Sequence, residues 1–152
     1  MNERIPIIRP DVAMGDLEDD IRTILESGIL TSGKYVAEFE QLVADWVGVD
    51  HGIATSSATT ALHLALTVAG VGPGDEVLLS DFTYPATANV VVQTGAIPVF
   101  VDSGTADLSM DPEHARALVS EKTRAIMPVD PLGQPADHLS LERLAKEVGV
   151  HV

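Results

Sequence analysis

Apolar residues recur with two different periods along this chain. Short runs rich in Val and Ile alternate with longer stretches in which apolar residues lie three and four positions apart. We expect strands in the short runs, which are GIAT from Gly52, EVLLS from Glu76, IPVFVD from Ile97, RAIMPVD from Arg124 and VGVHV from Val148. The alternation is typical of βαβ units and predicts an α/β fold with a largely parallel sheet.

Helices are expected before and between these strands. Two precede the first strand, over residues 15–27 and 36–47, joined by the turn-forming stretch SGILTSGK. Four more are expected over residues 58–69, 85–93, 112–120 and 139–148. The stretch 58–69 is apolar almost all the way round, which predicts a helix buried in the sheet layer.

The last apolar run, VGVHV, is typical of a parallel strand that has just begun. A buried strand without a covering crossover leaves apolar surface exposed. We therefore expect that the natural protein continues beyond Val152 or that a second chain covers this surface.

Composition narrows the function classes. The 152 residues are 45% hydrophobic, enough for one domain with a substantial core, and we expect no internal domain boundary. A formal net charge of −14 disfavours nucleic acid and anionic membrane surfaces as partners, although an acidic surface is also common in soluble proteins. The chain contains no cysteine, which excludes disulfides and thiolate chemistry. The apolar runs are too short to span a bilayer, and the start MNERIPIIRP is unlike a secretory signal, so we expect a cytoplasmic protein.

Candidate chemistry begins where TSSATTALHLAL turns from the first expected strand into a helix. Ser and Thr at this position cap the free amides of the first turn. The same geometry directs several N–H groups and the positive end of the helix dipole at one point, which suits a phosphate dianion. An ordinary helix cap and a phosphate site both fit these residues.

A second candidate lies in SDFTYPATAN, after the next expected strand. Open α/β sheets bind their ligands at the carboxyl ends of the strands. There the ring of Tyr84 could stack on a flat heterocycle, or it could pack half-buried over the start of the following helix.

Other polar residues carry weaker signals. Lys34, Lys122 and Lys146 are expected to be solvated surface side chains. The 5 histidines lack metal-ligand spacing, so we expect no metal site. GVGPGDE follows a helix and precedes a strand, the reverse of a dinucleotide-binding motif.

Several blocks of the sequence resemble, in order and spacing, the amino-terminal half of the DegT/DnrJ/EryC1/StrS aminotransferases. They are ILTSGKYVAEFEQLVADWVGVDHGIATSS, SSATTALHLAL, GVGPGDEVLLSDFTYPATANVVVQTGAIPVFVD, TRAIMPV and GQPAD. The resemblance covers essentially the whole chain. It implies a three-layer αβα sandwich, the truncated large domain of a pyridoxal phosphate (PLP) enzyme of fold type I. Residues 1–50 would be its helical amino-terminal segment and residues 51–152 its βαβ units, with the rest of the large domain and the small domain absent.

The resemblance also implies roles for individual residues. Ser57, Ala58 and Thr59 occupy the stretch that holds the PLP phosphate in this family. Tyr84 falls where the family places an aromatic residue over the pyridine ring, and Gly33 lies near the family's substrate entrance. The Schiff-base lysine and the Asp that contacts the pyridine nitrogen are expected beyond Val152, so no catalytic residue is assigned within the chain.

One departure from the family pattern precedes GQPAD. The family usually has a His followed by an aromatic residue there, and this chain has Asp130 and Pro131. This changes the expected shape of the pocket near that strand end.

Two functional hypotheses follow. The resemblance implies a PLP-dependent aminotransferase, usually a homodimer, that transfers an amino group from an amino acid to a keto-sugar or cyclitol. Related family members are dehydratases, and this chain alone is expected to be inactive. The alternative is a non-catalytic module of the same fold that binds phosphorylated ligands or pairs with another subunit.

Overall fold

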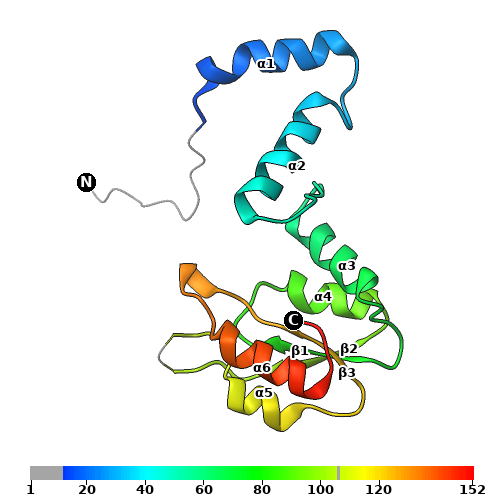
Figure 1. Ribbon diagram of the computed structural model, residues 1–152, viewed down its shortest axis with the longest axis vertical. Coiled ribbons are helices and arrows are strands. Elements are labelled where there is room, and N and C mark those ends of the chain that lie inside the picture. The colour runs from blue at the N-terminus through cyan, green and yellow to red at the C-terminus, as the bar shows by residue number, and fades with distance from the viewer. Residues whose placement is uncertain (1–11, 106) are drawn as a thin grey trace, which may run out of the picture. The chain divides into compact units, whose positions relative to one another are not determined.

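A computed structural model describes residues 12–105 and 107–152. The chain divides into two compact units, Met1–Ala54 and Thr55–Val152. Each unit is described by itself below (Figure 1).

The first unit contains two helices, α1 (Met14–Ser27) and α2 (Lys34–Val47). Each ends at a glycine in the left-handed conformation, Gly28 with φ 70° and Gly48 with φ 79°. Such residues terminate helices because glycine adopts positive φ without a steric penalty. The hydroxyl of Tyr35 donates a hydrogen bond of 2.7 Å to Asp20 Oδ1 and so connects the two helices.

The segment after α2 lies along that helix instead of forming the expected strand. At Gly52, a Cβ atom would lie 2.4 Å from the carbonyl oxygen of Glu40, so only glycine fits this close approach. The N–H of Ala54 donates to Glu40 Oε1 at 2.8 Å. The strand predicted from Gly52 is wrong for the described residues because the carboxylate of Glu40, not a neighbouring strand, takes this amide.

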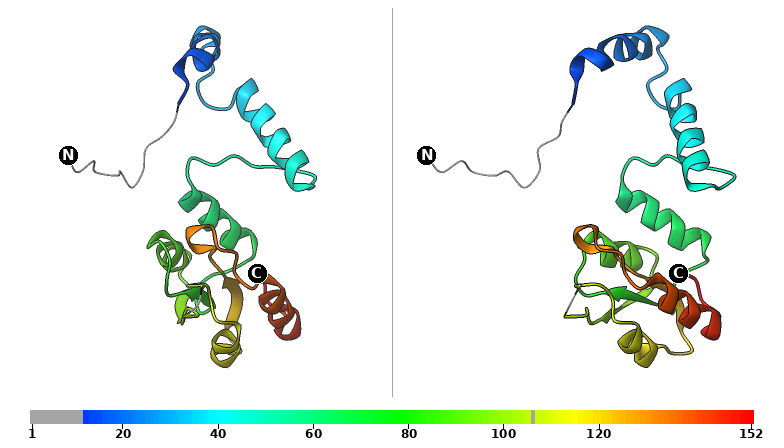
Figure 2. Two further views of the ribbon diagram at one scale, coloured as in Figure 1. Left: turned by 90° about the vertical axis from the view of Figure 1, so that its left-hand side faces the viewer. Right: turned by 60° about the vertical axis from the view of Figure 1, so that its left-hand side comes forward.

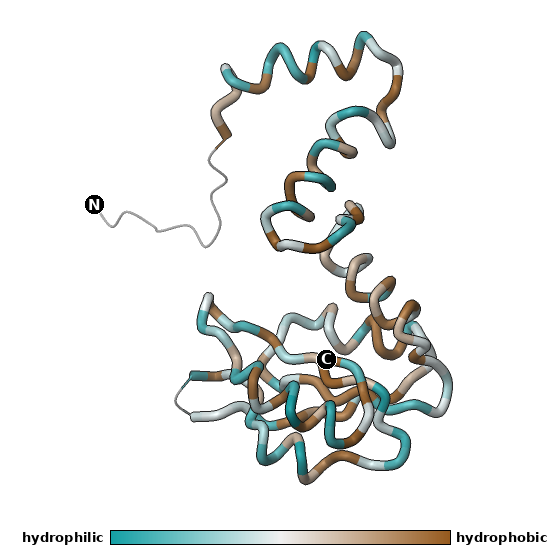
Figure 3. The backbone as a smooth tube through the Cα atoms, in the orientation of Figure 1, coloured by the Kyte–Doolittle hydropathy of each residue, from teal (hydrophilic) through white to brown (hydrophobic). Residues whose placement is uncertain are grey.

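The first unit buries little of its apolar surface. Ala44 is the buried residue of α2, and α1 has none. Brown and teal segments alternate along both helices in Figure 3, and apolar side chains remain exposed, with Trp46 at 92%. Helices with one apolar face need a partner surface to be stable.

The second unit is built on a parallel sheet. Its strands are β1 (Glu76–Ser80), β2 (Ile97–Val101) and β3 (Thr123–Met127), in the order β2-β1-β3. Both β2 and β3 pair with β1 in the parallel sense. The prediction of a parallel sheet is confirmed.

The last residues extend this sheet beyond β3. His151 forms a parallel bridge with Ala125. The N–H of Ile126 donates to the carbonyl of His151 at 2.8 Å, and the N–H of His151 donates to the carbonyl of Arg124 at 3.1 Å. The strand expected at the end of the chain is therefore present as a single bridge.

Helices cover both faces of the sheet, as Figures 1 and 2 show. On one face are α3 (Ala58–Val68) and α4 (Ala86–Gln93), and on the other are α5 (Pro112–Leu118) and α6 (His138–Val148).

Alternate side chains of β1 supply the two cores. Val77 and Leu79 are buried with residues of α3 and α4, whereas Leu78 is buried with residues of α5 and α6. Because successive strand residues point to opposite faces, one apolar strand serves both layers. The three-layer αβα arrangement is confirmed for this unit.

The predicted helix bounds agree with the structure to within about two residues at each end, and two details differ. Helix α5 ends at Leu118, since Val119 has extended backbone angles of −60° and 131°. Helix α3 is not buried all round, because Leu66 is its buried residue whereas Val68 is 80% exposed. Its apolar side toward α4 and the sheet is covered, and the prediction of a fully buried helix is wrong for the described residues.

Within the part of the chain that the structure describes, no helix is both long enough and apolar enough to cross a membrane.

Candidate functional site

The start of α3 has the cap geometry that its sequence predicts. Ser57 is extended, with φ −164° and ψ 160°, and its Oγ accepts a hydrogen bond of 3.2 Å from the N–H of Thr60. The hydroxyl of Thr60 lies 3.0 Å from Ser57 Oγ, and the hydroxyl of Thr55 donates to the carbonyl of Ser57 at 2.9 Å. These contacts fix the backbone where the chain enters the helix.

The first two amides of α3 remain available. Among the hydrogen bonds of the described residues, none is donated by the N–H of Ala58 or Thr59. Both residues are exposed. Two acceptor-free N–H groups at the positive end of a helix dipole, beside the hydroxyls of Ser57 and Thr59, form a donor set that suits a phosphate dianion. The residues present therefore fit the phosphate group of a cofactor.

Tyr84 lies between β1 and α4 with 78% of its surface exposed. Its backbone is held in place, since its carbonyl accepts a 3.0 Å hydrogen bond from the N–H of Thr87, and the hydroxyls of Thr83 and Thr87 are 2.7 Å apart. The alternative in which the ring packs half-buried over α4 is wrong. A fixed backbone with an exposed ring leaves the ring face free to stack on a ligand.

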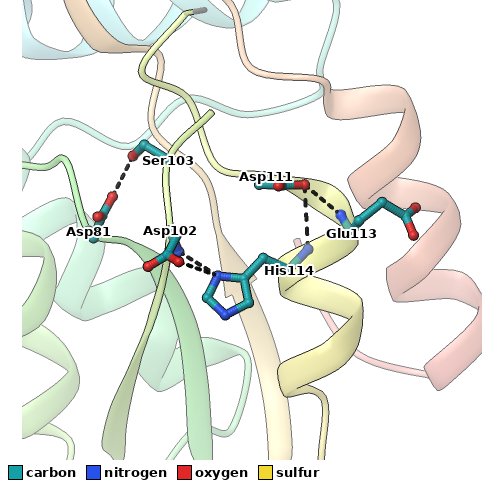
Figure 4. A network of polar contacts seen from close by, with 6 residues as sticks. All are labelled: Asp81, Asp102, Ser103, Asp111, Glu113 and His114. Atoms are coloured by element: carbon teal, nitrogen blue, oxygen red, sulfur yellow. Dashed lines mark hydrogen bonds and ion pairs between the residues drawn. The ribbon is translucent and has the colours of Figure 1, made fainter. Parts of the chain in front are cut away.

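A polar network surrounds the carboxyl ends of β1 and β2 (Figure 4). The hydroxyl of Ser103 donates to the carboxylate of Asp81, which joins the segments that follow the two strands. The N–H of Asp102 donates to His114 Nδ1 at 2.9 Å, and Asp102 Oδ2 lies 3.3 Å from the same nitrogen. Asp111 caps α5 by accepting from the N–H of Glu113 at 2.9 Å.

We assign this network a role in holding the fold together. His114 Nδ1 accepts the N–H of Asp102, which fixes the orientation of the ring. The network attaches α5 to the end of β2 and so stabilises the sheet edge. The sequence gives no signal for this network, since its contacts depend on how the loop after β2 folds.

Gly33 is the residue before α2, with φ −110°. It borders a pocket of about 270 Å³ in the first unit, which Thr31, Lys34 and Tyr35 also line. A Cβ at Gly33 would lie 3.6 Å from Ile29, an ordinary contact, so the backbone does not require glycine. The role of Gly33 in substrate binding stays a prediction.

Comparison with known proteins identifies the family. The model of the DegT/DnrJ/EryC1/StrS aminotransferase family matches residues 13–152. The chain belongs to this family.

Two curated proteins are similar to the chain over most of its length. The chain is 39% identical over 151 residues to the spore coat polysaccharide biosynthesis protein SpsC of Bacillus subtilis, with 99% of the chain and 39% of SpsC covered. It is 40% identical over 134 residues to the GDP-perosamine synthase of Caulobacter vibrioides, with 88% of the chain and 36% of that enzyme covered.

A solved relative has the same fold. The PLP form of Spr1654 from Streptococcus pneumoniae matches with a TM-score of 0.90 at 32% identity, and the match covers 99% of the chain and 38% of Spr1654. The chain thus spans less than two fifths of the length of each of these relatives. The family and its solved structures indicate PLP-dependent aminotransferases.

Asp130, where the sequence departs from the DegT/DnrJ/EryC1/StrS pattern, accepts two hydrogen bonds from residues that follow it in the chain. Asp130 Oδ1 accepts hydrogen bonds from the N–H of Ala136 and from His138 Nε2, each 2.9 Å long. The bond from Ala136, followed by the one from His138, lowers the pKa of Asp130. Asp130 is visible in the sequence as a departure from the family pattern, but its pairing with His138 is not, because that pairing depends on the path of the loop between them.

The lysines of this family member lie at the surface, as predicted. Lys34 Nζ is 3.5 Å from Glu38 Oε1 in the next turn of α2, and Lys122 and Lys146 are exposed. Within the described residues, no group of His, Asp and Glu side chains could hold a metal ion.

Proposed function

We propose that this chain is the amino-terminal part of the large domain of a PLP-dependent aminotransferase that acts on a keto-sugar or cyclitol with an amino acid as donor. The observation that carries the proposal is the pair of acceptor-free amides at Ala58 and Thr59, at the start of a helix in a chain of this family. The names of GDP-perosamine synthase and the polysaccharide biosynthesis protein SpsC support a sugar substrate.

Residues of this chain would bind and orient the cofactor. The amides of Ala58 and Thr59, with the hydroxyl of Ser57, would hold its phosphate, and the ring of Tyr84 would stack on its pyridine ring. When bound, PLP supplies an electron sink for the amino-bearing carbon of the substrate. The Schiff-base lysine and the Asp partner of the pyridine nitrogen are proposed to lie beyond Val152.

The exposed apolar surface supports a partner for the first unit. Phe39, Leu42 and Trp46 are 58%, 68% and 92% exposed on α2. We propose a homodimer in which such surface is covered. We propose separately that Gly33 lies near the substrate entrance. We also propose a cytoplasmic location, consistent with a chain that has no cysteine.

An activity assay on the intact protein encoded by the gene tests this function. The protein is incubated with PLP, glutamate and a panel of nucleotide-linked keto-sugars, and amino-sugar formation is followed by mass spectrometry. Conversion of one keto-sugar to its amino sugar, dependent on glutamate, is expected. PLP binding without conversion of any member of the panel, or of a cyclitol ketone, would favour the non-catalytic binding module instead.

A further inference from the structure

A single carboxylate closes the loop between β3 and α6, drawn in orange in Figure 1. The same oxygen, Asp130 Oδ1, accepts from the amide of Ala136 and the imidazole of His138. Pro131 and Ala136, at the two ends of the enclosed segment, are buried. These contacts hold both ends of residues 131–136, so the middle of the segment projects from a fixed base.

The projecting part has an unusual conformation. Leu132 has φ 54° and ψ 23°, in the left-handed region, and its side chain is 89% exposed. A non-glycine residue in this region is strained, and such strain persists only where the surrounding contacts impose it. Neither burial of the side chain nor a relaxed backbone conformation accounts for a leucine at position 132.

The loop lies at the edge of the sheet where ligands bind in open α/β folds. Strands β1 and β3 are parallel neighbours, with Leu79 paired to Met127, so their carboxyl ends share one edge. Tyr84 follows β1 and Asp130 follows β3. The loop of residues 131–136 and the exposed tyrosine therefore extend from adjacent strand ends.

The chemistry of the loop favours a sugar over an amino acid donor. Residues 131–136 read PLGQPA and contain no cation that would pair with a donor carboxylate. They offer an apolar side chain at Leu132 and an amide at Gln134, both exposed. An apolar surface beside a hydrogen-bonding amide suits a ring with hydroxyl groups and C–H faces.

We propose that Asp130 is a positioning residue that holds residues 131–136 so that Leu132 and Gln134 contact the keto-sugar acceptor. This inference rests on the proposed aminotransferase function and adds the element that recognises the acceptor.

The test compares the two half-reactions of the intact, PLP-loaded protein. Asp130→Ala removes both loop-closing bonds and is expected to raise KM for the keto-sugar roughly tenfold, with kcat changed less than about twofold and KM for the amino donor unchanged. Asp130→Asn retains an oxygen that accepts both bonds and is expected to stay within about threefold of wild type.

Two further variants separate positioning from folding. Asp137→Ala removes the adjacent cap of α6, whose carboxylate accepts the N–H of Ser140 at 3.1 Å, and is expected to leave KM for the keto-sugar unchanged. Leu132→Gly removes the exposed side chain at a position where glycine is relaxed, and is expected to raise that KM several-fold in a stably folded protein.

The outcomes are distinct. A wild-type protein without transamination overturns the proposed function and this inference together. An active wild type whose keto-sugar KM is unaltered in Asp130→Ala and Leu132→Gly overturns only the inference. Equal changes in the donor and acceptor half-reactions of Asp130→Ala also overturn it, because a general loss of structure affects both.

Discussion

The hydroxyl of Ser57 accepts a hydrogen bond from the backbone N–H of Thr60 at 3.2 Å, and this contact divides the amides at the start of α3 into two classes. The amide of Thr60 is satisfied within the chain. The N–H groups of Ala58 and Thr59 donate no hydrogen bond within the described residues and are free to bind an anion.

Replacing Ser57 with Asp should separate helix capping from anion binding. Asp caps helices about as well as Ser, so the free energy of unfolding should change by less than about 0.5 kcal/mol. Its negative charge would repel the phosphate, so PLP affinity should fall roughly tenfold or more. Urea denaturation and a PLP titration measure the two effects. Unchanged PLP affinity in a folded Ser57→Asp protein would contradict the assignment of this helix start.

Tyr84 should matter for the cofactor and little for the fold. Because its side chain is 78% exposed, Tyr84→Ala should change the free energy of unfolding by less than about 0.5 kcal/mol. Loss of ring stacking should weaken PLP binding by about three- to tenfold, whereas Tyr84→Phe keeps the ring and should bind nearly as well as wild type. Equal PLP affinities for the Ala and Phe variants would exclude stacking by this ring.

Gly52 should be intolerant of any side chain. A Cβ there would meet the carbonyl oxygen of Glu40 at 2.4 Å, so Gly52→Ala should destabilise the first unit by about 1–3 kcal/mol. Gly15, in α1, has open space around it, and Gly15→Ala should stabilise its helix by about 0.5–1 kcal/mol. Limited proteolysis within residues 12–54 compares the variants, and equal cleavage rates for the two would count against the close approach of Gly52 to α2.

Acid should destabilise the second unit through Asp137. Hydrogen bonds from the side chain and then the backbone of Ser140 lower the pKa of this carboxyl group. Its stabilising effect is therefore present above the unfolded pKa of about 4 and is lost as the pH falls through the lower folded pKa. Thermal unfolding between about pH 6 and pH 2.5 should show a smaller decline in Tm for Asp137→Ala than for wild type. Parallel declines would show that this carboxyl group is not linked to unfolding.

The sequence predicts the elements well where a local pattern sets them. The strand expected from Glu76 and the helices expected over residues 85–93 and 112–120 all begin within one residue of their predicted starts, at an apolar run and at the prolines Pro85 and Pro112. Each of these signals acts within a few residues of the chain, so no tertiary contact is needed to read it.

Features that depend on contacts between residues far apart in the chain could not be predicted from the sequence. The strand expected from Gly52 fails because Glu40 takes the amide of Ala54, a contact across fourteen residues of chain. The pairing of Asp130 with His138 spans a loop that contains Leu132 in the left-handed region, a conformation that an apolar residue does not predict. Periodicity cannot show which side of α3 is covered, and so the exposure of Val68 was missed.

The most direct measurement compares PLP with pyridoxal, which lacks the phosphate, in Ala58→Pro and wild-type intact protein. Proline suits the first position of a helix, and Ser57 before it is extended, so the variant should fold while losing one free amide. The account predicts that PLP affinity falls about tenfold or more and that pyridoxal affinity is unchanged. Equal affinity of the variant and wild type for PLP, or an equal loss for both ligands, would contradict it.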